Sequence, residues 1–349
     1  MRILYGVSPI GLGHATRSLV LSRELERSGA EVRFFSGGKA AEFIREEGLK
    51  VDDIVEDPVP HVSDVEMSRV ALWYVRSWIA NRRTVPRTRR LLDAYSPDLV
   101  VCDEEFSGIV VAGERGVKCV FIADELALGF ARTWLSRKIE ARVDRWYKGL
   151  QESVDLLIVP EPGESGGKRK FVGPIVRATT KSPAEAKASY GLPDGGMVLF
   201  ATSGSGLGRE LALRVRDAIA TAGLPRVSLV VTGNRGPRID GDEVYDLGVV
   251  PDNQNLVAAA DLVISTAGKS TIDEAAAAGT PIIVIPIRHH AEQERNAAAL
   301  GFTSGDVSRL PELISKMFGK RQQPRGFNGE VEASRAILSL DGAGGATAI

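Results

Sequence analysis

The sequence predicts an α/β protein with two doubly wound, Rossmann-like domains, each a parallel sheet with helices on both faces. Short apolar, β-prone runs alternate with amphipathic segments from residue 2 onward, which is the pattern of βαβ units. The alternation stops at 161–170, a stretch rich in Gly, Pro and charge, and then restarts. A chain of 349 residues is also long for one hydrophobic core and sufficient for two.

The N-terminal domain is predicted to span residues 1–160. Its expected strands and helices follow in chain order: strand Arg2–Val7, helix 15–28, strand Glu31–Ser36, strand 98–102, helix 106–115, strand 118–123 and strand Leu156–Val159. Consecutive parallel strands need such crossover helices, which cover the two faces of the sheet. The segment 161–170 is interpreted as the linker to the next domain.

The C-terminal domain is predicted to span residues 161–325. Its expected strands are 197–201, 228–232, 244–247, Leu262–Ser265 and 282–285, and its expected helices are 209–222, 256–259, 271–278 and 292–300. In one arrangement of residues 326–349, a helix crosses back to the N-terminal domain, and a disordered Gly/Ala-rich tail follows at 341–349. The two domains are expected to face each other across a cleft.

Bulk composition excludes several classes of protein. The net charge of −1 gives no reason to expect a nucleic-acid partner. No apolar run approaches the roughly 20 residues that a membrane-spanning helix needs. The two cysteines, Cys102 and Cys119, follow strand-like stretches and are predicted to be buried thiols in a reducing compartment. We therefore expect a cytoplasmic protein, attached peripherally to the cytoplasmic face of the cell membrane.

The first loop, Gly11-Leu12-Gly13-His14, follows a strand and opens a helix. Backbone N–H groups and the helix dipole at this point favour an anionic ligand. A dinucleotide-binding loop would have a third Gly where Thr16 stands, and an acid after the second strand, where the sequence has Gly37. The NAD interpretation therefore fails, and His14 becomes a candidate general base because imidazole titrates near neutral pH.

Two loops of the second domain suit a diphosphate. Small and hydroxyl residues follow its first strand, among them Ser203, Gly204 and Ser205. The second loop leads into a helix whose N-terminus favours anions; its candidate binding residues are Ala267, Gly268, Lys269, Ser270 and Thr271. A P-loop is excluded because Val263 stands where that motif requires Gly. Glu274, one turn into the helix, is positioned to accept two ribose hydroxyls.

These residues resemble the GT-B glycosyltransferases, and most closely the MurG-like branch, which transfers N-acetylglucosamine from a UDP donor to a lipid-linked acceptor in the synthesis of cell-envelope glycoconjugates. The resemblance covers nearly the whole chain. It implies an N-terminal acceptor-binding domain and a C-terminal donor-binding domain. It places these residues as follows: Gly13 in the first glycine loop, Glu125 on a family Glu, Arg177 near the donor, Val250 at the uracil, Glu274 at the ribose and Gln293 at the donor sugar.

The sequence departs from this branch in the acceptor half. The family's Gly-rich loop after the strand at 98–102 is replaced by Asp103-Glu104-Glu105-Phe106, the Asn that follows the family's His-Glu-Gln is absent, and residues 67–92 differ from the family's acceptor region. The donor class is therefore better supported by the resemblance than the acceptor.

The resemblance implies direct displacement at the anomeric carbon with inversion, and no metal or other cofactor, because helix N-termini can stabilise the departing UDP. Asp240-Gly241-Asp242 reads as a turn rather than a metal site.

The predicted catalytic residues are His14, Asp103 and Glu125; Glu104 and Asp124 remain rival bases, since acids at strand ends face the ligand in open α/β sheets. The alternatives are a non-hydrolysing UDP-sugar epimerase, transfer to a soluble acceptor, and a binding subunit without catalysis.

Two basic, aromatic segments favour contact with an anionic membrane surface. Residues 67–92 hold seven arginines and no acid, with Ala71, Tyr74, Val75 and Trp78 at helical spacing. Residues 130–148 add Trp134, Trp146, Tyr147 and six basic residues. These segments lead to the expectation of a lipid or lipid-linked acceptor.

Overall fold

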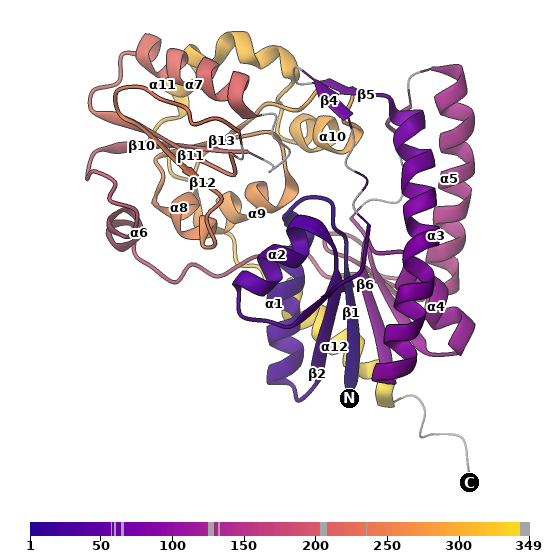
Figure 1. Cartoon of the computed structure of the whole chain (residues 1–349). Coiled ribbons are helices and arrows are strands. Elements are labelled where there is room, and N and C mark those ends of the chain that lie inside the picture. Colours follow the sequence, from indigo (N-terminus) through magenta and orange to yellow (C-terminus); the bar gives the residue numbers. More distant parts are fainter. Residues whose placement is uncertain are drawn as a thin grey trace. The chain divides into compact units, whose positions relative to one another are not determined.

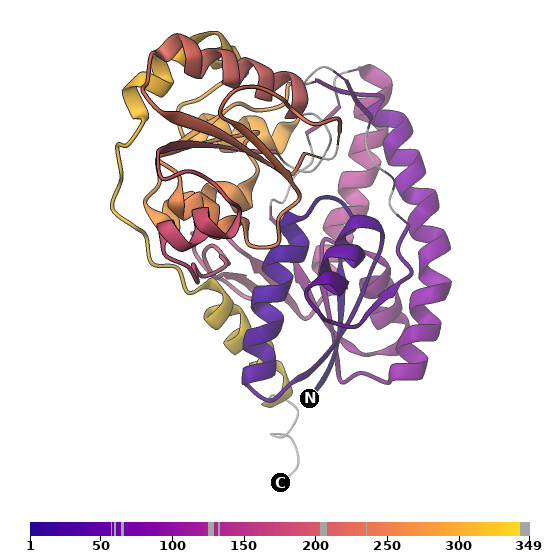
Figure 2. The ribbon, with the colours of Figure 1, turned by 60° about the vertical axis from the view of Figure 1, so that its left-hand side comes forward.

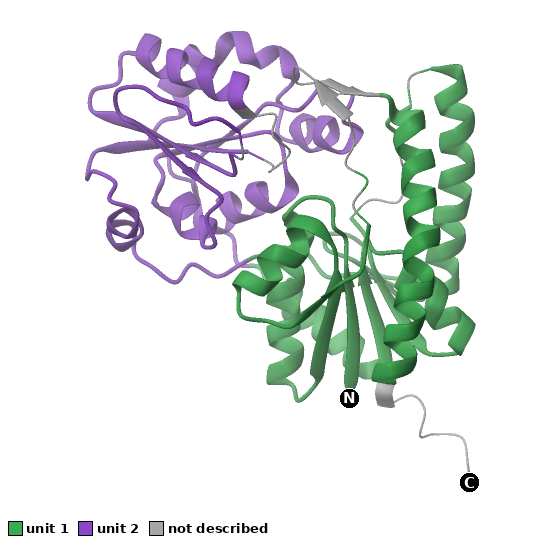
Figure 3. Ribbon diagram, in the orientation of Figure 1, with its two compact units in different colours: residues 1–60, 69–176, 327–349 green, residues 61–68, 177–326 purple. Residues whose placement is uncertain are grey.

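The computed structural model describes residues 1–56, 58, 61–63, 66–124, 129–131, 133–202, 208–234 and 236–342. The chain divides into two compact units (Figure 3). Unit 1 comprises residues 1–60, 69–176 and 327–349, and unit 2 comprises residues 61–68 and 177–326. Both units are α/β structures built on parallel sheets, as the sequence predicts.

Unit 1 contains a sheet of seven strands, all parallel to their neighbours (Figure 1). In spatial order these are β3 (Val51–Asp53), β2 (Glu31–Ser36), β1 (Arg2–Val7), β6 (Leu99–Asp103), β7 (Lys118–Ile122), β8 (Leu156–Val159) and β9 (Arg169–Phe171). Its helices are α1 (Gly13–Arg27), α2 (Gly38–Glu46), α3 (Val70–Tyr95), α4 (Ser107–Arg115), α5 (Trp134–Ser153) and α12 (Gly329–Gly342).

Both faces of the first sheet are covered, because successive side chains of a strand point to opposite faces. Ile3, Tyr5 and Val7 of β1 pack in the core beneath α1 and α12. Leu4 of the same strand packs with Val100 and other residues in the core beneath α4 and α5. Cys102 and Cys119 are free and buried in this second core, as expected of structural thiols.

The segment predicted to be a linker ends in a strand. Residues 169–171 form β9, which pairs in parallel with β8 at the edge of the first sheet. Arg169 and Lys170 are exposed there. Charged side chains are tolerated on an edge strand because one side of the strand faces solvent. A composition rich in charge therefore does not distinguish a linker from an edge strand at this position.

The C-terminal helix belongs to unit 1. α12 packs against α1, with Ala333 and Ile337 fully buried in the core on that side of the sheet (Figure 2). The disordered tail predicted for 341–349 lies outside the described residues from 343 onward.

Unit 2 contains a five-stranded parallel sheet. In spatial order its strands are β12 (Val244–Gly248), β11 (Val227–Thr232), β10 (Gly196–Ala201), β13 (Leu262–Ser265) and β14 (Ile282–Val284). Its helical elements are α6 (Pro183–Ser189), α7 (Gly208–Ala222), α8 (Asn253–Ala259), α9 (Lys269–Ala278), α10 (Ala291–Ala299), a 3₁₀ turn (Ser304–Arg309) and α11 (Leu310–Met317). The short antiparallel strands β4 (His61–Ser63) and β5 (Glu66–Ser68) also group with this unit.

Candidate functional site

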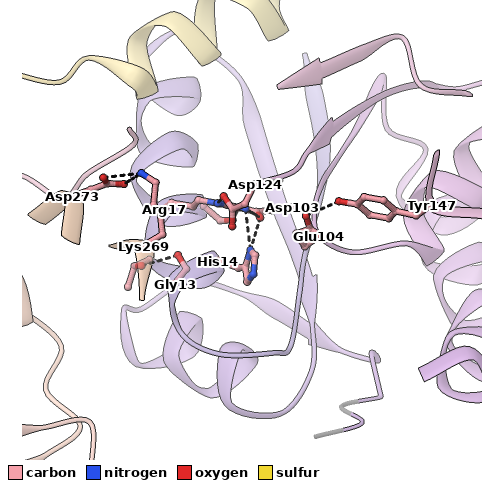
Figure 4. A network of polar contacts seen from close by, with 11 residues as sticks. Gly13, His14, Arg17, Asp103, Glu104, Asp124, Tyr147, Lys269 and Asp273 are labelled. Atoms are coloured by element: carbon pink, nitrogen blue, oxygen red, sulfur yellow. Dashed lines mark hydrogen bonds and ion pairs between the residues drawn. The ribbon is translucent and has the colours of Figure 1, made fainter. Parts of the chain in front are cut away.

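The polar site of unit 1 lies where β1 and β6 end. Val7 and Asp103, the last residues of these two neighbouring strands, are register partners. α1 begins six residues after β1, at Gly13. Its first turn therefore presents His14 to the end of β6, and Figure 4 shows the resulting network of polar contacts.

Asp103 is the centre of this network. Its side chain is fully buried, and it accepts hydrogen bonds from Arg17 Nε at 2.7 Å, Arg17 Nη2 at 2.5 Å and Ser18 Oγ at 2.9 Å. Burial alone raises the pKa of a carboxyl group, but the charge and hydrogen bonds of Arg17, together with His14, lower the pKa of Asp103 to about 2. Asp103 is thus a carboxylate at every physiological pH.

His14 Nδ1 lies 2.8 Å from Asp103 Oδ1 and 3.0 Å from Arg17 Nη2. An ionised carboxylate can only accept, so Nδ1 carries the proton, and Nε2 holds the lone pair. Burial and the Arg17 charge lower the pKa of His14, but Asp103 and the charge of Asp124 outweigh them and hold it above its ordinary value. The result is an oriented, partly exposed imidazole that can accept a proton at Nε2.

Arg17 is a member of the site that the sequence interpretation missed. It lies three residues after His14 on α1, so both side chains share one face of the helix. Its guanidinium binds Asp103 and also forms an ion pair with Asp124, after β7. The spacing of a His and an Arg at i and i+3 behind a glycine loop is the signal that could have identified it.

The residues after Asp103 take separate roles. Glu104 is half-buried and accepts a hydrogen bond from the hydroxyl of Tyr147 at 2.9 Å, whereas Glu105 is buried and binds the first turn of α4. Burial, with the Asp124 charge, raises the pKa of Glu104 to about 7. Glu125, the third predicted catalytic residue, lies outside the described residues.

In unit 2, Glu274 and Arg177 form a buried ion pair. Arg177 Nε and Nη2 lie 3.2 Å and 3.1 Å from Glu274 Oε1, and Arg177 also donates to the carbonyl of Pro251. Burial raises the pKa of Glu274, and the Arg177 charge opposes this shift. Pro251 directly follows Val250, so its contact with Arg177 links the backbone beside Val250 to Arg177 and Glu274, two other predicted donor-binding residues. The side chain of Val250 itself packs in the core.

α9 begins at the predicted loop. Ala267 has a left-handed backbone (φ 61°), and Gly268 caps the helix without a side-chain hydrogen bond. The first backbone N–H groups of α9, including those of Ser270 and Thr271, are the orphan donors of a helix N-terminus. The ammonium of Lys269 binds the Asp273 carboxylate at 2.7 Å and 2.5 Å.

Two buried hydroxyls lie at the ends of neighbouring strands of this sheet. Thr202 follows β10 and Thr266 follows β13, and the residues before them, Ala201 and Ser265, are register partners. Among the described residues, neither Thr202 Oγ1 nor Thr266 Oγ1 has a hydrogen-bond partner. An unpaired buried hydroxyl is unfavourable, so these atoms suit a polar ligand. The predicted positions Ser203, Gly204 and Ser205 lie outside the described residues.

Gln293 is buried and its Oε1 accepts from the backbone N–H of Ile287 at 3.0 Å. This hydrogen bond fixes the orientation of the amide and leaves Nε2 and the second lone pair of Oε1 for other contacts. The neighbouring His290 accepts from the Gln293 N–H as the N-cap of α10. Burial lowers the pKa of His290 to about 4, so it is a neutral capping residue at pH 7.

The basic, aromatic segments form α3 and α5, which pack together. Two aromatic side chains predicted to face a membrane are buried instead: Tyr74 donates to Glu140 on α5, and Tyr147 donates to Glu104. Helical spacing predicts which residues share one face of a helix, but it does not predict which neighbouring element covers that face. The apolar side chains that are exposed near the starts of these helices are Leu72, Val75, Trp78 and Ile79 on α3 and Trp134 and Leu135 on α5, which we call the apolar patch.

Basic residues accompany the apolar patch. The Arg82 guanidinium lies 4.9 Å from the ring centre of Trp78, and the Lys138 ammonium lies 4.1 Å from that of Trp134. Further along α3, Arg83 and Arg87 pair with Glu56, so acids from other segments balance part of the arginine charge. In the part of the chain that the structure describes, no helix is both long and apolar enough to cross a membrane.

Comparison with known proteins identifies the class of enzyme. Residues 1–151 match glycosyl transferase family 1, and residues 236–307 match the glycosyltransferase family 28 C-terminal domain. A glycosyltransferase of Methanosarcina mazei is 28% identical over 334 residues, covering 86% of this chain and 84% of the relative. The UDP-N-acetylglucosamine--N-acetylmuramyl-(pentapeptide) pyrophosphoryl-undecaprenol N-acetylglucosamine transferase of Nocardia farcinica is 29% identical, covering 82% and 76%.

Solved structures agree on the fold. Spinosyn rhamnosyltransferase SpnG superimposes with a TM-score of 0.65 at 18% identity, covering 97% of both chains. The calicheamicin glycosyltransferase CalG4 gives a TM-score of 0.61 at 19% identity and covers all of both chains. With the two parallel α/β units, these structures show that the chain has the GT-B fold. The matches to glycosyltransferase family models and to named glycosyltransferases show that it is a glycosyltransferase, with residues 236–307 similar to the family 28 C-terminal domain.

Proposed function

We propose that the protein transfers a hexose, with N-acetylglucosamine as the first choice, from a UDP-sugar to a lipid or lipid-linked acceptor at a membrane surface. The reaction is a direct displacement with inversion and without a metal ion. The observation that carries this proposal is the His14–Asp103 pair, with His14 Nδ1 2.8 Å from Asp103 Oδ1.

In this reaction His14 Nε2 takes the proton of the acceptor hydroxyl as its oxygen attacks the anomeric carbon of the donor. The carbon–oxygen bond to UDP breaks, and UDP leaves with both bonding electrons. Asp103 stabilises the imidazolium that forms, as a buried carboxylate does for other catalytic histidines. Arg17 keeps Asp103 ionised and in place.

On the donor side, Glu274 accepts the ribose hydroxyls and the N-terminus of α9 faces the diphosphate. Thr202 and Thr266, whose buried hydroxyls have no hydrogen-bond partner within the described part of the chain, support a polar ligand at the ends of β10 and β13. The Nocardia farcinica relative, named as an N-acetylglucosamine transferase that uses a pyrophosphoryl-undecaprenol acceptor, supports the choice of UDP-N-acetylglucosamine and of a lipid-linked acceptor.

The apolar patch supports the membrane part of the proposal. Trp78 and Trp134 are 57% and 70% exposed, and each has a cation over its ring. Exposed indoles beside Arg and Lys side chains suit the interface of an anionic bilayer.

The experiment is a donor and acceptor panel. The protein is incubated with UDP-N-acetylglucosamine, UDP-glucose, UDP-galactose or a thymidine diphosphate hexose, with and without glycolipids in vesicles. UDP release and product mass are measured. We expect UDP-N-acetylglucosamine to give the highest turnover and release to require an acceptor. Epimerised UDP-sugar without acceptor would instead establish the epimerase alternative.

Membrane contact is tested by flotation with vesicles of phosphatidylglycerol or of phosphatidylcholine alone. We expect binding to the anionic vesicles only, with its loss in the double variant Trp78→Ser/Trp134→Ser. Leu300→Ser is the matched control, because Leu300 is an exposed apolar residue of unit 2. Equal flotation of the double variant and the wild type would contradict the membrane proposal.

A further inference from the structure

Glu104 has an unusual backbone conformation at the end of β6. Its φ of 49° lies in the left-handed region, which non-glycine residues rarely adopt. Its N–H donates to the carbonyl of Ile122, the last residue of β7, which fixes the turn. The consequence is that Asp103, Glu104 and Glu105, three successive acids, point to three different places. Strained residues of this kind concentrate at functional sites.

Glu105 fills the N-terminus of α4. Its carboxylate accepts from the N–H of Ser107 at 2.9 Å, the hydroxyl of Ser107 at 2.6 Å and the N–H of Gly108 at 2.8 Å, and it is only 3% exposed. A helix N-terminus beside a reaction site would ordinarily suit a phosphate group. Here the protein's own carboxylate occupies those donors, so a phosphate of the substrate cannot use them.

Glu104 is half-buried beside the His14–Asp103 pair, whereas Asp124, which is also partly exposed, is held in an ion pair by Arg17. Figure 4 shows it between that pair and Tyr147, whose ring is buried against Phe106 and whose hydroxyl donates to Glu104 Oε1. The hydrogen bond fixes the carboxylate, and its other oxygen can accept a ligand hydroxyl.

Charged and polar groups on neighbouring elements act on the Glu104 carboxylate. α1 contributes His14 and Arg17, the segment after β7 contributes Asp124, and α5 contributes the hydroxyl of Tyr147. Arg17 is already paired with Asp103 and Asp124. With Asp103 included, an ionised Glu104 makes three carboxylates, with Asp124, against the guanidinium of Arg17 and the imidazole of His14, so negative charge is in excess even when His14 is protonated. A phosphate next to the reacting hydroxyl would therefore be repelled.

We infer that Glu104 determines acceptor specificity: it binds a second hydroxyl of the acceptor, so that the group carrying the reacting hydroxyl is an uncharged sugar or polyol, without a phosphate beside it. This inference rests on the proposed function, and it selects a neutral glycolipid among lipid acceptors. Glu104 contacts the acceptor; Tyr147 is a positioning residue that acts through Glu104.

The first test measures binding, with UDP at saturation so that the donor site is occupied. Methyl glucoside and glucose 1-phosphate are titrated into the wild type and into Glu104→Gln. We expect the wild type to bind the neutral glycoside about tenfold more tightly, and Glu104→Gln to lose this preference, because a carboxylate–hydroxyl bond and a charge repulsion are both removed. Glu152→Gln, an exposed glutamate of α5, is the control and keeps the preference.

The second test measures turnover with two vesicle acceptors, a glycosyl diacylglycerol and a polyprenyl diphosphate sugar. We expect the neutral glycolipid to be preferred by the wild type and the preference to shrink about tenfold in Glu104→Gln. In Tyr147→Phe, the acceptor KM rises while the donor KM is unchanged, a split that a general structural defect would not produce.

The results separate the two proposals. Equal or tighter binding of glucose 1-phosphate by the wild type, or an unchanged preference in Glu104→Gln, overturns the role of Glu104 regardless of turnover. Failure to release UDP with every acceptor and donor overturns the proposed function instead, and the binding test still decides the inference.

Discussion

The Nδ1 atom of His14 lies 2.8 Å from Oδ1 of Asp103, a fully buried carboxylate that Arg17 holds through two of its nitrogens. The pair joins the first turn of α1 to the end of β6. The arrangement gives the imidazole a fixed tautomer and a fixed direction, and several measurable consequences follow from it.

Asp103→Asn is expected to lower kcat by about 10³- to 10⁴-fold, because an amide can donate to Nδ1 and so stabilise the wrong tautomer of His14. Donor binding, measured by calorimetry with UDP, stays unchanged. Asp53→Asn, at the exposed end of β3, is the control and retains full activity. A folded Asp103→Asn protein with more than a tenth of wild-type kcat would contradict the role of Asp103.

Arg17→Met is expected to reduce the free energy of unfolding by about 3–5 kcal/mol, since it leaves the buried Asp103 carboxylate without its cation. Urea denaturation measures this. Arg27→Met, which removes an exposed i,i+3 pair with Glu24 on the same helix, should change stability by less than about 1 kcal/mol. Similar losses in both variants would show that the Asp103 contacts do not set the stability of this site.

The pH dependence of acceptor kcat/KM is expected to show an acid limb, because the raised pKa of His14 keeps the imidazole protonated at pH values above its ordinary 6.5. Activity falls as pH drops through this raised pKa. In His14→Asn the part of the limb that His14 causes should disappear, whereas the titration of Glu104, whose pKa is about 7, still affects acceptor binding.

The same raised pKa predicts the opposite trend for stability. Protonated His14 is favoured in the folded state, so its contribution is fully present below pH 6.5 and is lost as pH rises through the folded pKa. The difference in unfolding free energy between wild type and His14→Asn should therefore shrink with rising pH. A difference that grows with pH would contradict the assigned shift.

Glu274→Gln is expected to weaken UDP binding by about 10- to 100-fold, because the ribose hydroxyls lose a charged acceptor. The ribose itself is tested with 2′-deoxy-UDP. The wild type should bind it more weakly than UDP, whereas the variant should discriminate far less between the two. Glu312→Gln, an exposed glutamate of α11, is the control. Full discrimination in Glu274→Gln would place the ribose elsewhere.

Glu104→Gly is expected to be more stable than Glu104→Ala by about 1 kcal/mol in urea denaturation, because only glycine adopts the left-handed conformation without strain. Both variants lack the carboxylate, so their difference isolates the backbone. Both should also lose acceptor preference. Equal stability would show that the surrounding hydrogen bonds, rather than strain, govern this turn.

Much of the fold was predictable from local pattern. Strands Arg2–Val7, Glu31–Ser36 and Leu262–Ser265 have the bounds that apolar runs predicted, because fully buried parallel strands are continuous apolar segments. β9 was missed because Arg169 and Lys170 lie on an exposed edge, where polarity carries no information about pairing.

Sequence by itself determined the two parallel α/β units and the helix N-termini behind glycine loops, and it predicted His14, Asp103 and Glu274 as candidate site residues. Tertiary structure alone decided which distant residues these side chains contact. Arg17 clamps Asp103 and Asp124, which lie 86 and 107 residues away in the chain. Tyr147, read as an interfacial aromatic, is buried on Glu104. Spacing along one helix or strand fixes a face, but which distant side chain meets that face depends on how the strands pair and the helices pack, and no local pattern encodes it.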